Sequence, residues 1–195
     1  MDDPQFPLKA FEAAGWRVSI HGQKAYNGVA MVSREALEDV RCGFIGELPD
    51  DSEATALSEQ KRVISARLDG VRVLNLYVPN GSGLKSEKYP YKLSWLACLR
   101  RYLDAQAERG EPLCMVGDFN IAMEARDIHD PDRLTGGIMA SSAERDALKA
   151  ALGDRLQDVF RVFEPDSGHW SWWDYRTGAW AVSYTHLTLP TMRTV

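Results

Sequence analysis

The feature that most constrains the fold of this chain is a pair of strands joined by Asp69-Gly70 and followed by a long helix and a further strand. The β-branched and apolar runs at 63–68 and 71–77 flank an Asp-Gly dipeptide, which favours a two-residue hairpin turn. From 91 to 109 apolar residues recur at three- and four-residue spacing, which predicts an amphipathic helix, and the run at 113–116 predicts a buried strand. The hairpin argues against a purely parallel sheet, so we expect a mixed sheet flanked by helices.

Further elements are predicted on either side of this unit. Ser141 and Glu144 have the spacing of a capping box, which predicts that a helix begins there. The other expected elements are a short helix at 6–15, strands at 16–20, 29–32 and 170–175, and the end of the capped helix near 153. This mixture predicts the α/β (α+β) class, whereas the threonine-rich stretch 181–195 shows neither a helical nor a strand pattern.

Length, charge and cysteine content narrow the class of protein. The 195 residues suffice for one domain, and a hydrophobic content of 45% allows a buried core. A net charge of −5 argues against a protein that holds nucleic acid by bulk positive charge. The three cysteines form no Cys-x-x-Cys pair, and no apolar run reaches the ~18 residues of a membrane span. We therefore expect a cytoplasmic monomer that does not bind membranes.

The most informative segment for function follows the strand at 113–116, where Asp118 and Asn120 lie two residues apart. In an extended chain such residues point to the same side, so we expect both at one site. A carboxylate and an amide oxygen suit a hard cation such as Mg²⁺, and an aspartate can also transfer a proton. The same residue types form turns, and on spacing alone the two interpretations stand about even.

A second candidate lies where the strand at 71–77 runs into Val78-Pro79-Asn80-Gly81. Tyr77 at the strand end could donate a hydrogen bond to a phosphate oxygen, or accept a proton if its pKa were lowered from ~10. Taken alone, a tyrosine at such an edge is more often an amphipathic side chain with a buried ring and a solvated hydroxyl. Asn80 carries the same two interpretations.

The loop at 22–28 and the aromatic segment around Trp172 are candidate DNA contacts. Lys24, Tyr26 and Asn27 combine a cation, an aromatic ring and an Asn-Gly turn, which suits a phosphate backbone and a stacked sugar or base. A plain hairpin loop has the same composition. Trp172 belongs to a cluster of three tryptophans, for which core packing is the default role.

Two charged clusters are interpreted as structural. His129 lies between aspartates in a loop that contains proline, and no second histidine stands at a metal-ligand spacing, so we expect a hydrogen-bonded loop anchor. A positive run within and before the long helix is typical of a solvated helix face; it comprises Lys85, Lys88, Lys92, Arg100 and Arg101.

Five segments taken together resemble the bacterial exodeoxyribonuclease III family. They are GQKAYNGVA at 22–30, NLYVPNG at 75–81, VGDFNIA at 116–122, DIHDP at 127–131 and SWWDYR at 171–176. Five blocks in this order are far more specific than any one of them. The resemblance runs from about 4 to 180 and implies the endonuclease/exonuclease/phosphatase fold, a four-layer α/β sandwich of two packed sheets with outer helices.

The resemblance also implies an activity and a set of residue roles. The activity is Mg²⁺-dependent hydrolysis of phosphodiesters in double-stranded DNA, at abasic sites and at 3′ ends, with Mn²⁺ as an alternative cation. Asp118 matches a proton donor or acceptor at the metal, and Asn120 its partner at the metal and phosphate. Tyr77 matches a catalytic phosphate contact and Asn80 a further phosphate contact, while Trp172 matches, more weakly, an aromatic residue against the abasic sugar.

Two segments of that family have no counterpart in this sequence. One is an early strand and a Gln-Glu-Thr segment that supplies a metal-binding glutamate, and the other is a late Asp-His pair that supplies the general base. We therefore expect a chain truncated at both ends, with a partial domain at 1–180, a non-native tail at 181–195, and little or no activity. Two other functions remain open: a phosphoesterase of the same superfamily acting on a non-DNA substrate, and a non-catalytic DNA-binding module.

Overall fold

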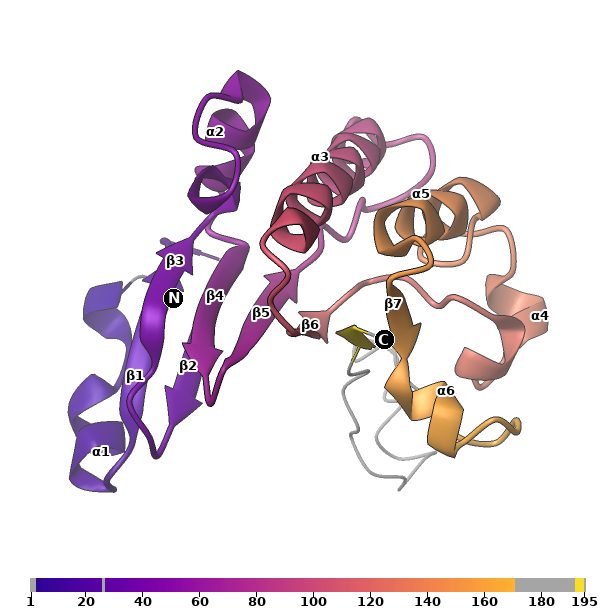
Figure 1. Cartoon of the computed structure of the whole chain (residues 1–195). Helices are drawn as coiled ribbons and strands as arrows, with labels where there is room; N and C mark the ends of the chain where they lie inside the picture. The colour runs from indigo at the N-terminus through magenta and orange to yellow at the C-terminus, as the bar shows by residue number, and fades with distance from the viewer. Residues whose placement is uncertain (1–2, 26, 171–191, 195) are drawn as a thin grey trace.

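The chain folds into two β-sheets with helices on their outer faces (Figure 1); this computed structural model describes residues 3–25, 27–170 and 192–194. A two-stranded antiparallel sheet is formed by β1 (Arg17–Gly22) and β2 (Gly28–Ser33). The second sheet has six strands in the order β3-β4-β5-β6-β8-β7: β3 (Glu38–Cys42), β4 (Val63–Leu68), β5 (Val71–Tyr77), β6 (Leu113–Asp118), β7 (Leu156–Asp158) and β8 (Met192–Thr194).

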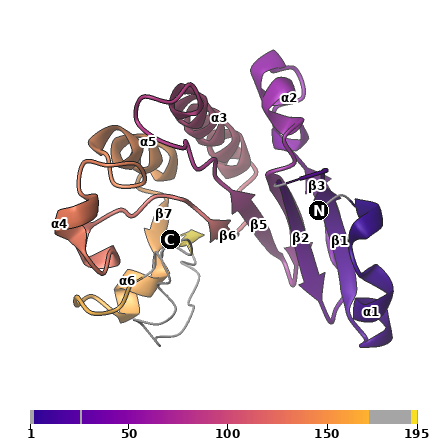
Figure 2. The same ribbon diagram turned by 180° about the vertical axis from the view of Figure 1, so that it is seen from behind.

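The helices and the two sheets form layers. The helices are α1 (Leu8–Ala13), α2 (Ser52–Ser58), α3 (Lys88–Glu108), α4 (Pro131–Leu134), α5 (Ser142–Leu152) and α6 (Val159–Phe163). In Figures 1 and 2, α3 and α5 lie side by side on one face of the large sheet, the β1–β2 sheet lies on the other side, and α1 lies beyond β1. The expected mixed α/β architecture of two sheets flanked by helices is thereby confirmed.

The predicted hairpin is present, and it determines where the later strands lie. β4 and β5 pair antiparallel around Asp69 and Gly70, whose positive φ angles of 49° and 79° are those of a type I′ turn. α3 then crosses over the sheet, so β6 pairs with β5 in parallel. The register places Tyr77 opposite Asp118, and the carboxyl ends of β5 and β6 therefore meet at the same edge.

Close approach of β5 and β6 requires a glycine at one position. Gly117 has φ +126°, and a Cβ built on it would lie 2.0 Å from the backbone oxygen of Leu76. No L side chain fits between the two backbones at this distance. Only glycine can therefore precede Asp118 in this strand.

The core lies between the large sheet and α3, as the helical periodicity predicts. The buried face of α3 includes Trp95, Leu96, Leu99 and Tyr102, and these residues pack in one cluster with Leu74 and its neighbours on the strands. α5 joins this cluster through Leu148 and Leu152, after the predicted capping box of Ser141 and Glu144. The two helices thus become a rigid support for the loops that leave the sheet edge.

Some expectations differ from the structure. The edge strand β3 and the short helices α2, α4 and α6 carry no clear periodicity and were not predicted. Within the stretch where no regular pattern was expected, Met192–Thr194 forms β8 and pairs with β6 and β7, so the expectation was wrong for these three residues. The strand expected at 170–175 lies outside the described residues beyond 170. No helix among the residues described is long and apolar enough to cross a membrane.

Candidate active site

Asp118 and Asn120 lie together at the end of β6, but not for the reason that strand geometry predicts. β6 ends at Asp118, and Asn120 lies beyond it with a positive φ of 48°. The backbone N–H of Asn120 donates to Oδ1 of Asp118 at 3.0 Å, which is the hydrogen bond of an Asx turn. The turn interpretation is therefore correct, and the turn brings the carboxylate and the amide together. Their role at a cation site stays a prediction.

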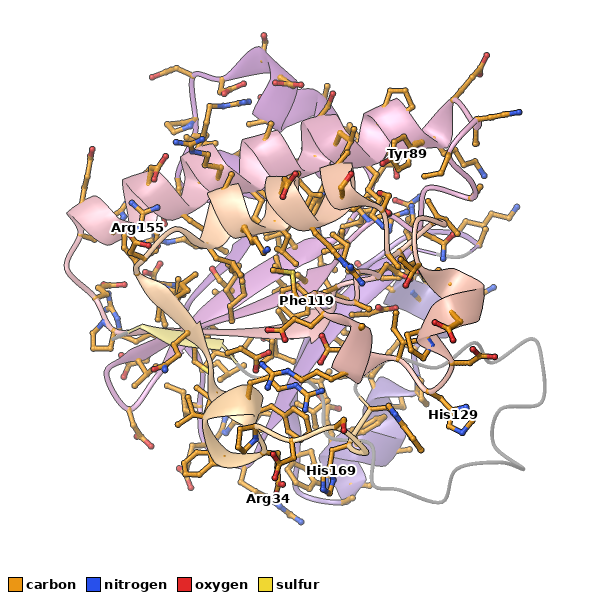
Figure 3. All side chains as sticks on the ribbon, turned by 90° about the vertical axis from the view of Figure 1, so that its right-hand side faces the viewer. Arg34, Tyr89, Phe119, His129, Arg155 and His169 are labelled. Carbon is orange, nitrogen blue, oxygen red and sulfur yellow. The ribbon has the colours of Figure 1, made fainter. Side chains whose placement is uncertain are left out.

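Phe119 anchors this turn in the core. Its side chain is 4% exposed, and Figure 3 shows it beneath α3 and α5. Asp118 before Phe119 keeps part of its surface open to solvent although protein groups surround its carboxylate, while Asn120 after it is 8% exposed. The buried Phe119 side chain therefore fixes the position of the turn that carries both polar side chains.

Asn80 and Asn120 join the loops that follow β5 and β6. The Nδ2 group of Asn80 donates to Oδ1 of Asn120 at 3.3 Å, and Nδ2 of Asn120 donates to the backbone oxygen of Val78 at 3.0 Å. Oδ1 of Asn80 accepts from the N–H of Ser82 at 3.1 Å. Both asparagines thus have defined amide orientations, and the structure brings these two sequence-predicted site residues into contact.

The environment of Asp118 shifts its pKa upward. Removal from water by the surrounding protein groups raises the pKa of this carboxyl group above 3.8, because it disfavours the charged form. Hydrogen bonds from Asn120 and the positive charges of Lys92 and Arg62 oppose this effect. A carboxyl group with a raised pKa is better suited to proton transfer near neutral pH, and as an oxygen ligand it can also hold a hard cation.

Tyr77 is connected to the 22–28 loop by Arg62, a residue that sequence reasoning missed. The Arg62 guanidinium lies 4.7 Å from the centroid of the Tyr77 ring, and it donates to the Tyr77 backbone oxygen at 3.1 Å. It also donates to Oδ1 of Asn27 at 2.8 Å, and Asn27 donates to Gln60 at 3.4 Å. Asn27 is therefore brought to the Tyr77 edge, although its amide is used in contacts within the protein.

Of the remaining predicted DNA contacts, which are Lys24, Tyr26 and Trp172, the structure describes only Lys24. Lys24 is exposed in the β1–β2 loop. Tyr26 and Trp172 lie outside the described residues. His129 lies in contact with the aromatic ring of Trp170, with ring centroids 4.5 Å apart in an edge-to-face arrangement, and its predicted role as a hydrogen-bonded loop anchor stays a prediction.

The interpretation of Lys92 as part of a solvated helix face is wrong. Its side chain is 0% exposed, and its ammonium group pairs at 2.5 Å with Glu144, which is also 0% exposed. Lys92 also donates to the Asn120 backbone oxygen at 2.7 Å. The helical spacing could have indicated that Lys92 is buried. Position 92 precedes the buried residues Trp95 and Leu96 by three and four residues and so lies on the same helix face.

The donor set at this edge suits a hard divalent cation. Asp118 supplies carboxylate oxygens and Asn120 an amide oxygen, which are ligand types preferred by Mg²⁺ and Mn²⁺. Among the residues described, no group of three or more histidine, cysteine, aspartate or glutamate side chains could hold a metal ion. A cation at this site would therefore take most of its ligands from water and from a bound phosphate.

Comparison with known proteins places this arrangement in a family. The profile of the Endonuclease/Exonuclease/phosphatase family matches residues 1–186. The chain belongs to this family. Exodeoxyribonuclease III of Haemophilus influenzae is 32% identical over 187 residues, which cover 90% of the chain and 67% of the relative. The chain spans about two thirds of the length of the bacterial relatives that it matches.

Solved structures support the same assignment. The 3′ phosphatase NExo from Neisseria, bound to a product DNA hairpin, is 36% identical with a TM-score of 0.85, over 99% of this chain and 72% of that protein. An AP endonuclease from Archaeoglobus fulgidus is 33% identical with a TM-score of 0.85, over 100% of this chain and 72% of that protein. The predicted resemblance to exodeoxyribonuclease III is confirmed. The family also confirms the predicted enzyme class, a nuclease that hydrolyses phosphodiester bonds.

Proposed function

We propose that this chain is a DNA phosphodiesterase of base-excision repair, which requires a divalent cation and acts on double-stranded DNA at abasic sites and at 3′ ends. The observation that carries the proposal is the meeting of Tyr77 with Asp118 in the β5–β6 register, completed by the bond between Asn80 and Asn120. The names of the relatives reported above support the proposal: one is an exodeoxyribonuclease, one a 3′ phosphatase bound to DNA and one an AP endonuclease.

In this proposal each residue has a separate task. Asp118 and Asn120 hold the cation, with Mg²⁺ preferred and Mn²⁺ as an alternative, and Asp118 also holds or moves a proton at its carboxylate. The Tyr77 hydroxyl and the Asn80 amide donate hydrogen bonds to phosphate oxygens. The cation, when bound, neutralises negative charge that develops on the phosphate. These donors are fixed before substrate arrives, so little reorganisation is needed when the charge develops.

The charge balance of the site predicts that the cation and DNA bind together. The positive charges of Lys92 and, to a lesser extent, Arg62 favour the charged form of Asp118. Arg62 donates to Asn27, Gln60 and the Tyr77 carbonyl, which are all neutral. The charge of Lys92 is balanced separately by Glu144. With one carboxylate to hold it, Mg²⁺ alone binds weakly, and a bound phosphate adds oxygen ligands and a second negative charge. We therefore expect Mg²⁺ to tighten DNA binding and DNA to tighten Mg²⁺ binding by the same factor.

Other parts of the proposal concern the periphery of the site. Lys24, Tyr26 and Asn27 contact the DNA backbone, and Trp172 lies against the abasic sugar. Residues 1–180 form the nuclease domain in this proposal, and within the stretch 181–195 β8 (Met192–Thr194) joins its large sheet. The three free cysteines favour a reducing compartment, which supports a cytoplasmic enzyme, and we propose that it acts as a monomer.

The test is incision of a duplex that contains one tetrahydrofuran abasic analogue, with Mg²⁺ or with EDTA. We expect slow, Mg²⁺-dependent incision that Asp118→Asn abolishes. Asp69→Asn is the matched control, because it makes the same chemical change at an exposed turn at the opposite end of β5. Incision that persists in EDTA or in Asp118→Asn would overturn the assigned role of Asp118.

The same assay separates the two other functions. A phosphoesterase for another substrate would hydrolyse a small phosphodiester with Mg²⁺ and fail to bind the duplex. A non-catalytic DNA-binding module would bind the duplex equally well with Mg²⁺ and with EDTA, and Asp118→Asn would not change its affinity.

A further inference from the structure

We propose that Lys92, held by Glu144, is a positioning residue that fixes the loops after β5 and β6 relative to each other and so aligns Asn80 with Asn120. This inference rests on the proposed function, because the two asparagines are the groups assigned there to the phosphate and the cation. Lys92 itself touches neither of these ligands in the proposal. It acts through the backbone of the residues that do.

The geometry of the ammonium group supports this role. Its Nζ donates to the Glu144 carboxylate at 2.5 Å, to the backbone oxygen of Asn120 at 2.7 Å, and to the backbone oxygen of Asn80 at 3.4 Å. An ammonium group has three donors, and here each points to a different segment of the chain. One atom on α3 therefore connects α5 with both site loops.

Glu144 is held rigidly, and this fixes the ammonium group. Its carboxylate accepts from the backbone N–H of Met139 at 3.1 Å and of Ser141 at 3.2 Å, and from the Ser141 hydroxyl at 2.5 Å. The Ser141 hydroxyl also lies 2.7 Å from the hydroxyl of Tyr89, which Figure 3 shows at the start of α3. The carboxylate is thus anchored to the first turn of α5 and, through Ser141 and Tyr89, to α3.

Further hydrogen bonds between the two loops involve Val78: its N–H donates to the Asp118 backbone oxygen at 2.9 Å, and its backbone oxygen accepts from Nδ2 of Asn120 at 3.0 Å. β6 ends before Asn120, so the sheet ladder does not extend to it, and Asn120, Gly81 and Ser82 all have positive φ angles. The side-chain bond between Asn80 and Asn120 is long, at 3.3 Å. A buried ion pair brings little net stability compared with apolar packing, which α3 and α5 already use at Leu96 and Leu148. The pair is therefore best explained by what the ammonium group holds in place.

The experiment compares the chain with Lys92→Met/Glu144→Gln, which removes both charges and keeps a capping residue on α5. The first measurement is the ¹H–¹⁵N signals of the Asn80 and Asn120 side-chain amides. The second is the factor by which Mg²⁺ tightens binding to the abasic-analogue duplex. Leu96→Ala is the control, since it destabilises the same helix from a buried apolar position that makes no hydrogen bond to either loop.

We expect the double variant to shift or broaden both amide signals and to lose at least about fivefold of the Mg²⁺ effect. Leu96→Ala should keep both, although it lowers stability. Unchanged amide signals and an unchanged Mg²⁺ effect in the folded double variant would overturn the inference. If the double variant does not fold, Tyr89→Phe removes the outer anchor at Ser141, and the same two amide signals should move in it, or the inference fails.

The two proposals fail in different ways. If Mg²⁺ does not affect DNA binding by the parent chain, the proposed function is wrong, and the amide signals alone still decide whether Lys92 positions the loops. If the parent shows the Mg²⁺ effect and the double variant keeps it, the function stands and the positioning role is wrong.

Discussion

Replacement of Lys92 by methionine tests how the buried ion pair contributes to stability. Both side chains are 0% exposed, so Lys92→Met leaves the Glu144 carboxylate buried without its cation. Removing one partner of a buried pair costs about 3–5 kcal/mol, because the remaining charge keeps its desolvation penalty. Methionine retains most of the aliphatic stem, which packs next to Gly81, so a cavity adds little to this cost. We therefore expect the free energy of unfolding to fall by about 3–5 kcal/mol.

The second substitution tests the reasoning. Glu144→Gln in the Lys92→Met background removes the uncompensated charge and keeps an acceptor for the Ser141 bonds. We expect the double variant to recover more than half of the lost stability, measured by urea unfolding at pH 7 with tryptophan fluorescence. A loss below about 1 kcal/mol in Lys92→Met, the range of exposed ion pairs, would contradict this account. A double variant no more stable than Lys92→Met would do the same.

Three further predictions concern the strand end, the site carboxylate and the α5 cap. Gly117→Ala should lower the free energy of unfolding by about 3 kcal/mol or more, because the φ of Gly117 is nearly exclusive to glycine and the new Cβ meets the backbone of Leu76. Gly70→Ala is the control: open space surrounds it, so it should cost about 1–2 kcal/mol in urea unfolding. Partial removal of the Asp118 carboxylate from water raises its pKa, so the folded state binds this proton more tightly and its ionisation lowers stability above that pKa. Asp118→Asn should therefore raise the melting temperature at pH 7, and the gain should shrink as the pH falls toward 3.8. Ser141→Ala should cost about 1–2 kcal/mol in unfolding, since α5 loses its N-cap, and a cost near zero would show that the cap is dispensable.

Periodic and turn-forming patterns predicted the central part of the fold. The Asp69-Gly70 turn, the α3 spacing and the apolar run of β6 each depend on local chemistry, and the structure has all three within a few residues of the expected bounds. β3 escaped prediction because it is a short edge strand whose residues 38–40 are exposed, so no alternation of burial marks it. Edge strands of this kind form through pairing with a neighbour rather than through their own sequence.

The candidate site residues were proposed from the sequence, but the contacts that connect them were not. Asp118 and Asn120 were identified as neighbours, whereas the Asx turn that joins them depends on a positive φ that spacing does not reveal. Arg62 and Lys92 act through partners 35 and 52 residues away. Such contacts follow from the tertiary fold, because the parallel register of β5 and β6 and the packing of α3 on α5 decide which groups meet. The helical position of Lys92 was the one local sign of its burial.

The central claim is that the carboxyl ends of β5 and β6 form a joint site for a cation and a phosphate. The most direct test measures the affinity of the chain for an abasic-analogue duplex with and without Mg²⁺. The account predicts that Mg²⁺ lowers the Kd by at least about fivefold for the parent and for Asp69→Asn, and has no effect for Asp118→Asn. An equal effect of Mg²⁺ in Asp118→Asn, or none in the parent, would contradict it.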